Sequence, residues 1–536
     1  MSQPTTGVPA AAGTAAPPAP AMTRREVLEA LSGIMLGVFV SLLATTIVST
    51  SLPQIVAELH GSQHSYTWVV TAMLLTMTIS TPLWGKLADL TNRKVLMQVA
   101  LAVTVVSAAA AGLSQNIEML IGFRALQGIG AGGLTALATV LMADIISPRE
   151  RGKYMGLMGG VMAVAQIGGP LLGGVITDSA LGWRWTFFVG VPFAVAAFVV
   201  LQKTLHLPAR DKRVVKIDYA GAVLIAVAVA LLLLWVTFAG DQFEWASWQT
   251  GAMVGGAVVA LLAAGLVERA AAEPIIPLHL FKNRTFVLAV VGSASVGVAM
   301  FGTAVFLSQY FQLARGKTPT ESGLLTIPMV VGTMLAGLVL GRIISNTGRY
   351  KAIMVSGAAV LTLSLFGLST IEVDTSFVLI SVYLFGLGLS VGALMQNLVL
   401  ATQNTLDVHE MGAGTSGVAF FRSLGGAIGV SALGAVMAAK IKTDLTTGLA
   451  ELGVPASAMG GESGAIPSDL SALPDAVRGV IESAYSDGIT TIFLYAVPMA
   501  VISLIAVLFI KEIPLGQRSG IEQVLDEQRE EQAQVA

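Results

Sequence analysis

Cysteine is absent from the 536-residue sequence, and charged residues make up only 12% of it. The absence of thiols excludes disulfide bonds and thiolate metal sites, although it says nothing about the compartment. An ordinary soluble protein carries roughly 25% charged residues. Together with 54% hydrophobic residues and a mean hydropathy of +0.78, this shortage of charge indicates a protein embedded in lipid.

The signatures of several other protein classes are missing too. No G-x-x-x-x-G-K-[ST] loop is present, which disfavours transport driven by ATP. The apolar segments contain no cluster of histidines, cysteines or carboxylates, so we expect no enzymatic activity, no metal site and no cofactor. With a net charge of −2 and no basic domain, the chain is not expected to bind nucleic acid.

Apolar segments long enough to cross a bilayer run through most of the chain. A transmembrane helix needs about 20 apolar residues, whereas barrel strands would be shorter and would alternate. We therefore predict an all-α integral membrane protein with fourteen transmembrane helices, near 31–52, 66–87, 95–114, 118–143, 154–177, 185–203, 219–240, 250–267, 286–310, 322–343, 352–371, 376–402, 413–438 and 488–510.

Lysine and arginine indicate how these helices are oriented. Basic residues concentrate in cytoplasmic connections. If the N-terminus is inside, only six of the 30 basic residues fall in outer connections, namely Arg184, Arg315, Lys317, Lys440, Lys442 and Arg478. We therefore predict a multi-pass protein of the plasma membrane with both termini in the cytoplasm.

Short signatures recur in the two halves at nearly the same offset. The segment 85-GKLADLTNRK-94 resembles 341-GRIISNTGRY-350, an offset of 256. Gly128 and Gly130 match Gly386 and Gly388 at 258, while the Gly-Gly pair at 168–169 matches 425–426 at 257. The spans 219–240 and 250–267 have no counterpart. The repeat predicts two pseudo-symmetric six-helix bundles with an inserted helix pair, an arrangement typical of transporters that bind cargo between the halves.

These observations predict the following organisation of the chain. The first residues lack the charged start and apolar core of a signal peptide. We expect a disordered cytoplasmic tail over 1–25, a first bundle over 26–210, the inserted pair over 211–270, a second bundle over 271–510 with a mobile outer loop at 440–487, and a cytoplasmic tail over 511–536.

The loop 85–94 carries a candidate conformational latch made of Gly85, Asp89, Arg93 and Lys94. Gly85 would permit close helix approach, and Asp89 can pair with Arg93 or Lys94 or cap a helix. Asn92 tolerates positive φ better than most residues, so a tight turn is expected there. Such a charged cluster could lock one conformation and release in the other. The alternative is an ordinary positive-inside loop.

The loop resembles the G-x-L-x-D-R-x-G-R-R/K motif of the major facilitator superfamily, with Leu90 and Asn92 as departures. The run 124-RALQGIGAGG-133 resembles the family's R-x-x-Q-G-x-G motif, which implies a gating or coupling role for Arg124, Gln127 and Gly128. The stretches at 183–192 and 273–286 look like marks of the fourteen-helix drug:proton antiporter branch, of the kind found in actinobacteria. The resemblance covers roughly 30–510 and implies the major facilitator fold.

The span 154–177 resembles the antiporter motif of the same family. Its matching residues are Gly156, Gly169, Pro170, Gly173 and Gly174, with Ala165 as the one departure. Glycine lets helix backbones approach closely, and Gly169-Pro170 weakens the helix and permits a bend. The resemblance implies that this bend favours export. The alternative is that the glycines serve packing alone.

One expected carboxylate is missing. In this branch the first helix commonly carries an Asp as a proton or cation site, and here Ala44 stands in its place. No Asp or Glu occupies the centre of any predicted span, although a proton carrier usually needs a titrating group within reach of both sides. The remaining candidate proton carriers are Asp144, Asp178 and Glu321. Each also has an alternative reading as an interfacial or capping acid.

Arg124 and Arg422 are the cations placed deepest in the predicted spans. Inserting a central Arg costs about 2.5–3.5 kcal/mol, which makes an idle one improbable. Snorkelling to the interface is the alternative, chiefly for Arg124. We expect both guanidinium groups to face a central cavity and to bond to glutamines, exposed carbonyls or an anionic group of the substrate.

The family fold implies a cavity between the two bundles. The expected substrate-binding residues are Thr45, Thr46, Gln166, Gln309, Gln396, Asn397, Phe421 and Arg422. A few hydrogen-bonding groups in an apolar cavity suit bulky amphipathic molecules better than sugars. Met is abundant, at 21 residues, which is consistent with an adaptable pocket.

The sequence therefore predicts a secondary transporter that exports hydrophobic or amphipathic drugs by alternating access, coupled to proton entry. Its expected partners are small amphipathic substrates, protons and the lipid bilayer, and we expect a monomer. A dedicated exporter of one metabolite, such as an antibiotic, siderophore or lipid, is the first alternative. A membrane receptor or enzyme without transport is the second.

Overall fold

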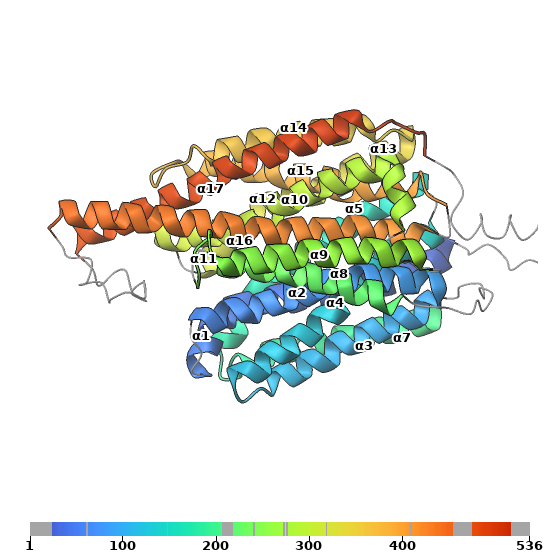
Figure 1. The fold of residues 1–536 in the computed structure, drawn as a ribbon, viewed down its shortest axis with the longest axis horizontal. Coiled ribbons are helices and arrows are strands. Elements are labelled where there is room, and N and C mark those ends of the chain that lie inside the picture. The colour runs from blue at the N-terminus through green and yellow to red at the C-terminus, as the bar shows by residue number, and fades with distance from the viewer. Residues whose placement is uncertain are drawn as a thin grey trace, which may run out of the picture.

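The computed structural model describes residues 24–515 except 60–62, 147, 206–217, 240–241, 272–273, 275–276, 318, 408–409 and 454–473. The predicted tail 1–25 lies outside this part apart from its last two residues, which begin the first helix. The described chain is built from helices, with one isolated bridge between Ala239 and Phe243 and no named strand. Both described ends lie on the same side of the helix bundle, at the right of Figure 1.

The first bundle and the inserted pair account for eight of the predicted spans. The helices of the first bundle are α1 (Arg24–Glu58), α2 (Gln63–Leu90), α3 (Arg93–Gly112), α4 (Ile117–Ile145), α5 (Pro148–Asp178), α6 (Arg184–Phe188) and α7 (Gly190–Thr204). The inserted pair is α8 (Tyr219–Phe238) and α9 (Trp248–Ala270). A break between α6 and α7 divides the sixth span into two pieces.

The second bundle begins after the short 3-10 helix η1 (Leu278–Lys282). Its elements are α10 (Arg284–Gln309), η2 (Tyr310–Ala314), α11 (Pro319–Leu325), α12 (Ile327–Leu335), η3 (Ala336–Leu340), α13 (Gly341–Thr347), α14 (Lys351–Leu368), α15 (Phe377–Gln403), α16 (Met411–Glu451) and α17 (Asp475–Phe509). The predicted span 322–343 is thus a chain of α-helical pieces interrupted at Thr326 and by the π-helical turn η3. Pro328 lies in the first turn of α12, where its missing N–H cannot continue the hydrogen bonding of α11 across this break.

Thirteen helical stretches of the described chain are long and apolar enough to cross a membrane. The one remaining predicted span, 219–240, corresponds to α8, whose apolar stretch Ala220–Val236 is shorter. All fourteen predicted spans are therefore helical. Two of the helices are longer than predicted: α16 continues to Glu451 and α17 begins at Asp475, so both ends of the predicted loop 440–487 are helical.

Glycines set the spacing between the helices of the first bundle. A methyl group at Gly128 would overlap the carbonyl oxygen of Met73, and one at Gly133 would come within 2.7 Å of the Trp84 ring. Thr76 and Trp84 use this closeness to donate hydrogen bonds to α4 carbonyl oxygens, at 2.6 and 2.8 Å. Small residues allow such close backbone approach in a membrane, and here they join α2 to α4.

The second bundle repeats this contact. A methyl group at Gly388 on α15 would overlap the carbonyl oxygen of Met329 on α12, and Thr333 donates to the Gly388 carbonyl at 3.1 Å. Gly388 therefore occupies the place that Gly128 has in the first bundle. The sequence comparison matched Gly128 with Gly386, which is displaced by two residues. Several nearby glycines make the sequence match ambiguous. The backbone contacts identify the equivalent positions.

Two helix pairs join the bundles. α5 of the first bundle packs against α12, η3 and α13 of the second, and α2 packs against α16. The inserted α8 lies over the α2–α16 contact, where Ile225, Val229 and Leu233 share an apolar cluster with residues of both helices (Figure 1). The inserted pair therefore covers one seam between the bundles and leaves the other seam, along α5, uncovered by it.

We expect Gly388→Ala to lower the free energy of unfolding by about 1–3 kcal/mol, the usual cost of adding a methylene to a filled site. Gly255→Ala on α9 is the matched control, because a methyl group there meets no atom within 4 Å. Thermal unfolding of both variants in detergent measures the difference. Equal stability of the two variants would contradict close packing at Gly388.

Candidate functional site

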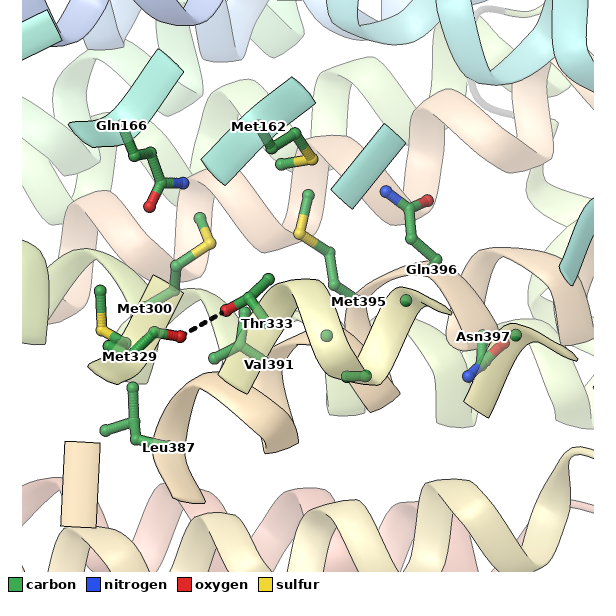
Figure 2. Close-up of a pocket in the computed structure, with 14 residues that line it drawn as sticks. Met162, Gln166, Met300, Met329, Thr333, Leu387, Val391, Met395, Gln396 and Asn397 are labelled. Carbon is green, nitrogen blue, oxygen red and sulfur yellow. Dashed lines mark hydrogen bonds between the residues drawn. The ribbon is translucent and has the colours of Figure 1, made fainter. Parts of the chain in front are cut away.

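A pocket lies between the two bundles along the α5 seam. α5 contributes Met162 and Gln166, and the second bundle contributes the remaining side (Figure 2). The pocket encloses about 710 Å³ of empty space, counted together with its open mouth. The other lining residues are Met300, Met329, Thr333, Ala336, Gly337, Gly341, Leu387, Val391, Gly392, Met395, Gln396 and Asn397. A cavity between two pseudo-symmetric halves is where a transporter holds its cargo.

The lining combines soft apolar groups with a few amides. Four methionines and three amide side chains are present, and no lining residue carries a charge. Asn397 donates to the Ala393 carbonyl at 2.7 Å, whereas the amides of Gln166 and Gln396 make no hydrogen bond within the described chain. Figure 2 shows these two amides on opposite walls of the pocket. They are available to orient a ligand.

The π-helical turn η3 shapes one wall of this pocket. Ala336 begins the turn, Gly337 lies within it and Gly341 follows it, and all three line the pocket. π-helical turns in proteins are frequent at functional sites. The wider turn changes the direction in which the following residues face, so the lining cannot be derived from a regular 3.6-residue repeat.

Thr45, Thr46 and Phe421, which were also predicted for the cavity, are not among the residues that line this pocket. Thr45 and Thr46 donate to carbonyls one turn earlier in α1, and Thr46 also reaches the Ala165 carbonyl on α5 at 3.2 Å. Phe421 packs edge-on against Phe420 and Phe281, in the cluster beneath α8. The side chain of Gln309 lies outside the described residues. Thr46 and Phe421 thus belong to helix contacts, because their helices turn these positions away from the pocket.

The methionines of the pocket could not be assigned individually from the sequence. Met162, Met300, Met329 and Met395 come from four different helices. In the sequence, only the general abundance of methionine pointed to such a pocket, because any single methionine could equally well face lipid. Their flexible, polarizable side chains can adapt to ligands of different shape.

Arg124 is buried and held by polar groups of three helices. Its side chain is 2% exposed. Nη1 donates to Gln127 Oε1 at 2.9 Å and to the Ala44 carbonyl at 3.1 Å, and Nε donates to the Val69 carbonyl at 3.4 Å. These bonds connect α4 to α1 and α2. The backbone of Ala44 thus supplies an acceptor where the expected aspartate is missing.

Arg422 is equally buried but lacks such partners. Its residue is 6% exposed, and its guanidinium makes no hydrogen bond or ion pair with the described residues. The residue lies against α10, because its carbonyl oxygen occupies the space beside Gly297. The two arginines that the sequence placed together as cavity cations therefore have different environments.

The candidate latch is built around Arg93. Its guanidinium pairs with Asp144 on α4 and donates from Nε to the Ala88 carbonyl at 2.7 Å. Lys94 donates to the Gln202 carbonyl at 2.8 Å, and Gly85 lies against Ser416 and Gly412 of α16. The expected positive φ at Asn92 is wrong: its φ is −71°, and it caps α3 by accepting from Lys94 and Val95. The side chain of Asp89 lies outside the described residues.

Comparison with known proteins decides the family. The sequence model of the family described as "Major Facilitator Superfamily" matches residues 34–430 of this chain. The chain belongs to the major facilitator superfamily. It is 37% identical over 492 residues to an uncharacterized MFS-type transporter of Mycobacterium tuberculosis, Rv1877, covering 92% of this chain and 70% of that protein.

Two other relatives have names that state an activity. The multidrug transporter protein MdtP of Bacillus subtilis is 31% identical over 515 residues, covering 92% of this chain and 94% of the relative. Multidrug resistance protein 3 of the same organism is 30% identical over 484 residues, covering 89% and 94%. The crystal structure of the human organic anion transporter MFSD10 has the same fold, with a TM-score of 0.58, 14% identity, and coverage of 88% and 99%. The protein is a multi-pass membrane transporter of this superfamily.

The candidate proton carriers differ in their surroundings. Asp144 is buried and paired with Arg93, while Glu321 is exposed near the start of α11. The side chain of Asp178 lies outside the described residues. The charge state of Asp144 therefore affects an internal contact.

The glycines of the antiporter motif have unequal roles in packing. A methyl group at Gly169 would overlap Thr46 of α1, whereas one at Gly174 would meet no atom within 4 Å. Gly173 is buried, and Gly156 and Pro170 lie in the same helix, α5. In this conformation close packing explains Gly169 but not Gly174.

We expect Asp144→Asn to destabilise the protein by about 3–5 kcal/mol, because it leaves Arg93 buried without its counter-ion. The double variant Arg93→Met/Asp144→Leu should recover most of this loss, since it removes both charges. Unfolding in detergent measures both. If the double variant is less stable than Asp144→Asn, the ion pair does not stabilise the protein mainly by neutralising a buried charge.

Proposed function

We propose that this protein exports amphipathic small molecules across the plasma membrane by alternating access, using proton entry as the energy source. The observation that carries the proposal is the pocket between the bundles, where four methionines meet two amides that make no hydrogen bond with the described residues. Adaptable apolar contacts accommodate cargo of varied shape, and a few hydrogen bonds fix its orientation. The names of the Bacillus subtilis relatives support drug efflux.

The proposed orientation places both termini in the cytoplasm, as the distribution of lysine and arginine predicts. Gly85, Arg93 and Asp144 then lie on the cytoplasmic side. Here α2 and α4 meet α16 through the contacts of Gly85 with Ser416 and of Ala143 with Met411. We infer that these contacts close the cytoplasmic entrance and that the Arg93–Asp144 pair stabilises the closed arrangement.

We propose that Asp144 carries the coupled proton. A carboxylate that loses its charge on protonation no longer attracts Arg93, so the latch weakens when the proton binds. Cargo binding and proton binding would occupy separate places, because the pocket itself has no lining acid. Asp178 and Glu321 remain alternative carriers.

A dedicated exporter of one metabolite is the second candidate. Relatives at 33% and 31% identity bear the names efflux pump dotC, from Dothistroma septosporum, and acurin A biosynthesis cluster MFS-type transporter, from Aspergillus aculeatus. The second name links that relative to a single natural product. A panel of chemically diverse compounds distinguishes the candidates, since a dedicated exporter should move only one structural class.

We expect Gln166→Leu/Gln396→Leu to reduce efflux efficiency about tenfold, because the cargo would lose two buried hydrogen bonds worth about 0.5–1.5 kcal/mol each. Efflux of a fluorescent amphipathic dye from proteoliposomes with an imposed pH gradient measures it. Gln115→Leu, an exposed position in the connection after α3, is the matched control.

The same vesicles test the energy source. Wild-type efflux should stop when the gradient is collapsed, and Asp144→Asn should retain cargo binding while losing the response to the gradient. Efflux that ignores the gradient would contradict proton antiport. Unchanged efflux by the double glutamine variant would contradict the assignment of the pocket.

A further inference from the structure

Arg422 is a buried cation whose role the fold does not explain. It lies eleven positions after Met411, which begins α16, and therefore roughly 16 Å along that helix. Only 6% of its surface is exposed, and its guanidinium has no hydrogen-bond or ion-pair partner in the described chain. A buried charge is costly unless it is paired. A group from outside the chain could supply the missing acceptor.

Arg124 shows how this protein satisfies a buried arginine with its own polar groups. That guanidinium bonds to the carbonyls of Ala44 and Val69 and to Gln127. The second bundle does not repeat this arrangement at Arg422, which lies on the fifth helix of its bundle rather than on the fourth. A purely structural explanation is therefore available for Arg124 and lacking for Arg422.

Arg422 lies against α10, the helix that contributes Met300 to the pocket. Its backbone oxygen lies against Gly297, so closely that a methyl group at 297 would overlap it. Met300, which lines the pocket, follows Gly297 by three residues on the same face of α10, a rise of about 4.5 Å. An arginine side chain can span that distance. The same segment of α10 thus contacts Arg422 through Gly297 and lines the pocket through Met300.

The charges around the pocket favour one class of cargo. The lining contains no carboxylate that could pair with a cationic ligand. A guanidinium presents five N–H donors in a planar fork that matches a carboxylate or phosphate. The methionines can meanwhile enclose an apolar body.

We propose that Arg422 binds an anionic group of the cargo, so that the transporter prefers amphipathic anions to cations. This inference rests on the proposed export function. The anionic group is a carboxylate, sulfonate or phosphate attached to an aromatic or aliphatic body. A phospholipid headgroup offers the same chemistry, and the lipid composition in the experiment separates the two sources.

Three dansyl compounds test this preference, because they share one aromatic body and differ in one end group. Dansylglycine carries a carboxylate, dansylamide is neutral, and a dansyl trimethylammonium derivative is cationic. Their fluorescence is titrated against the full chain in nanodiscs of phosphatidylcholine, with empty nanodiscs as the baseline. The carboxylate should bind at least about tenfold more tightly than the other two, as expected for one charge-assisted contact.

Substitution of the arginine assigns this preference to one residue. Arg422→Gln should reduce carboxylate affinity to the level of the amide, and Arg422→Lys should keep part of the preference. Arg349→Gln removes an exposed charge from the same bundle and should change nothing. Melting temperature and elution volume confirm that each variant is folded, and unchanged dansylamide affinity confirms an intact pocket.

Several outcomes overturn the inference. Equal binding of the three probes, preference for the cation, or a carboxylate preference that survives in Arg422→Gln would each do so. Loss of the preference when phosphatidylglycerol is added would assign Arg422 to a lipid headgroup instead. In all these cases a gradient-driven efflux of dansylamide would leave the export function standing, whereas no gradient-driven efflux of any probe would count against that function.

Discussion

The hydrocarbon core of a bilayer cannot form hydrogen bonds, and this constraint determines how the chain uses its polar groups. Most threonine and serine hydroxyls within the helices donate a hydrogen bond to the carbonyl oxygen one turn earlier, as Thr104 and Ser390 do. Arg124 follows the same rule with carbonyls of two neighbouring helices and one glutamine. Among the described residues, Gln166, Gln396 and Arg422 depart from this rule, since their side chains make no hydrogen bond within that part of the chain, and two of them line the pocket.

Close helix contacts are the second consequence of the lipid environment. Apolar burial does not drive helices together in a bilayer, so packing depends on small residues and on bonds between helices. The contacts of Gly128 with Met73 and of Gly388 with Met329 show one solution used in both bundles. Repeating it produces two similar units, and the pocket lies where these units face each other. A pocket in such a position can change its exposure when the units tilt.

The helices, the repeat and the family could be predicted because hydropathy and local motifs are properties of short segments. Arg93 was likewise expected in a charged cluster. Its observed partner, Asp144, lies 51 positions away, and only the packing of α3 on α4 brings the two together. The pocket was predictable in part: Gln166, Gln396 and Asn397 line it, while Thr46 and Phe421 face other helices. The rotation of each helix and the π-helical turn η3 decide this, and neither is encoded in a regular sequence period.

The central claim is that the pocket opens to each side of the membrane in turn. The absence of cysteine makes this accessible to a direct measurement, with Met395→Cys as a single label inside the pocket. A membrane-impermeant thiol reagent is applied to right-side-out and to inside-out vesicles, with Asp407→Cys, an exposed position four residues after α15, as a control for one side. The account predicts that Met395→Cys reacts from both sides, in proportions that change with the imposed pH gradient. Reaction from one side alone, under every gradient, would contradict alternating access.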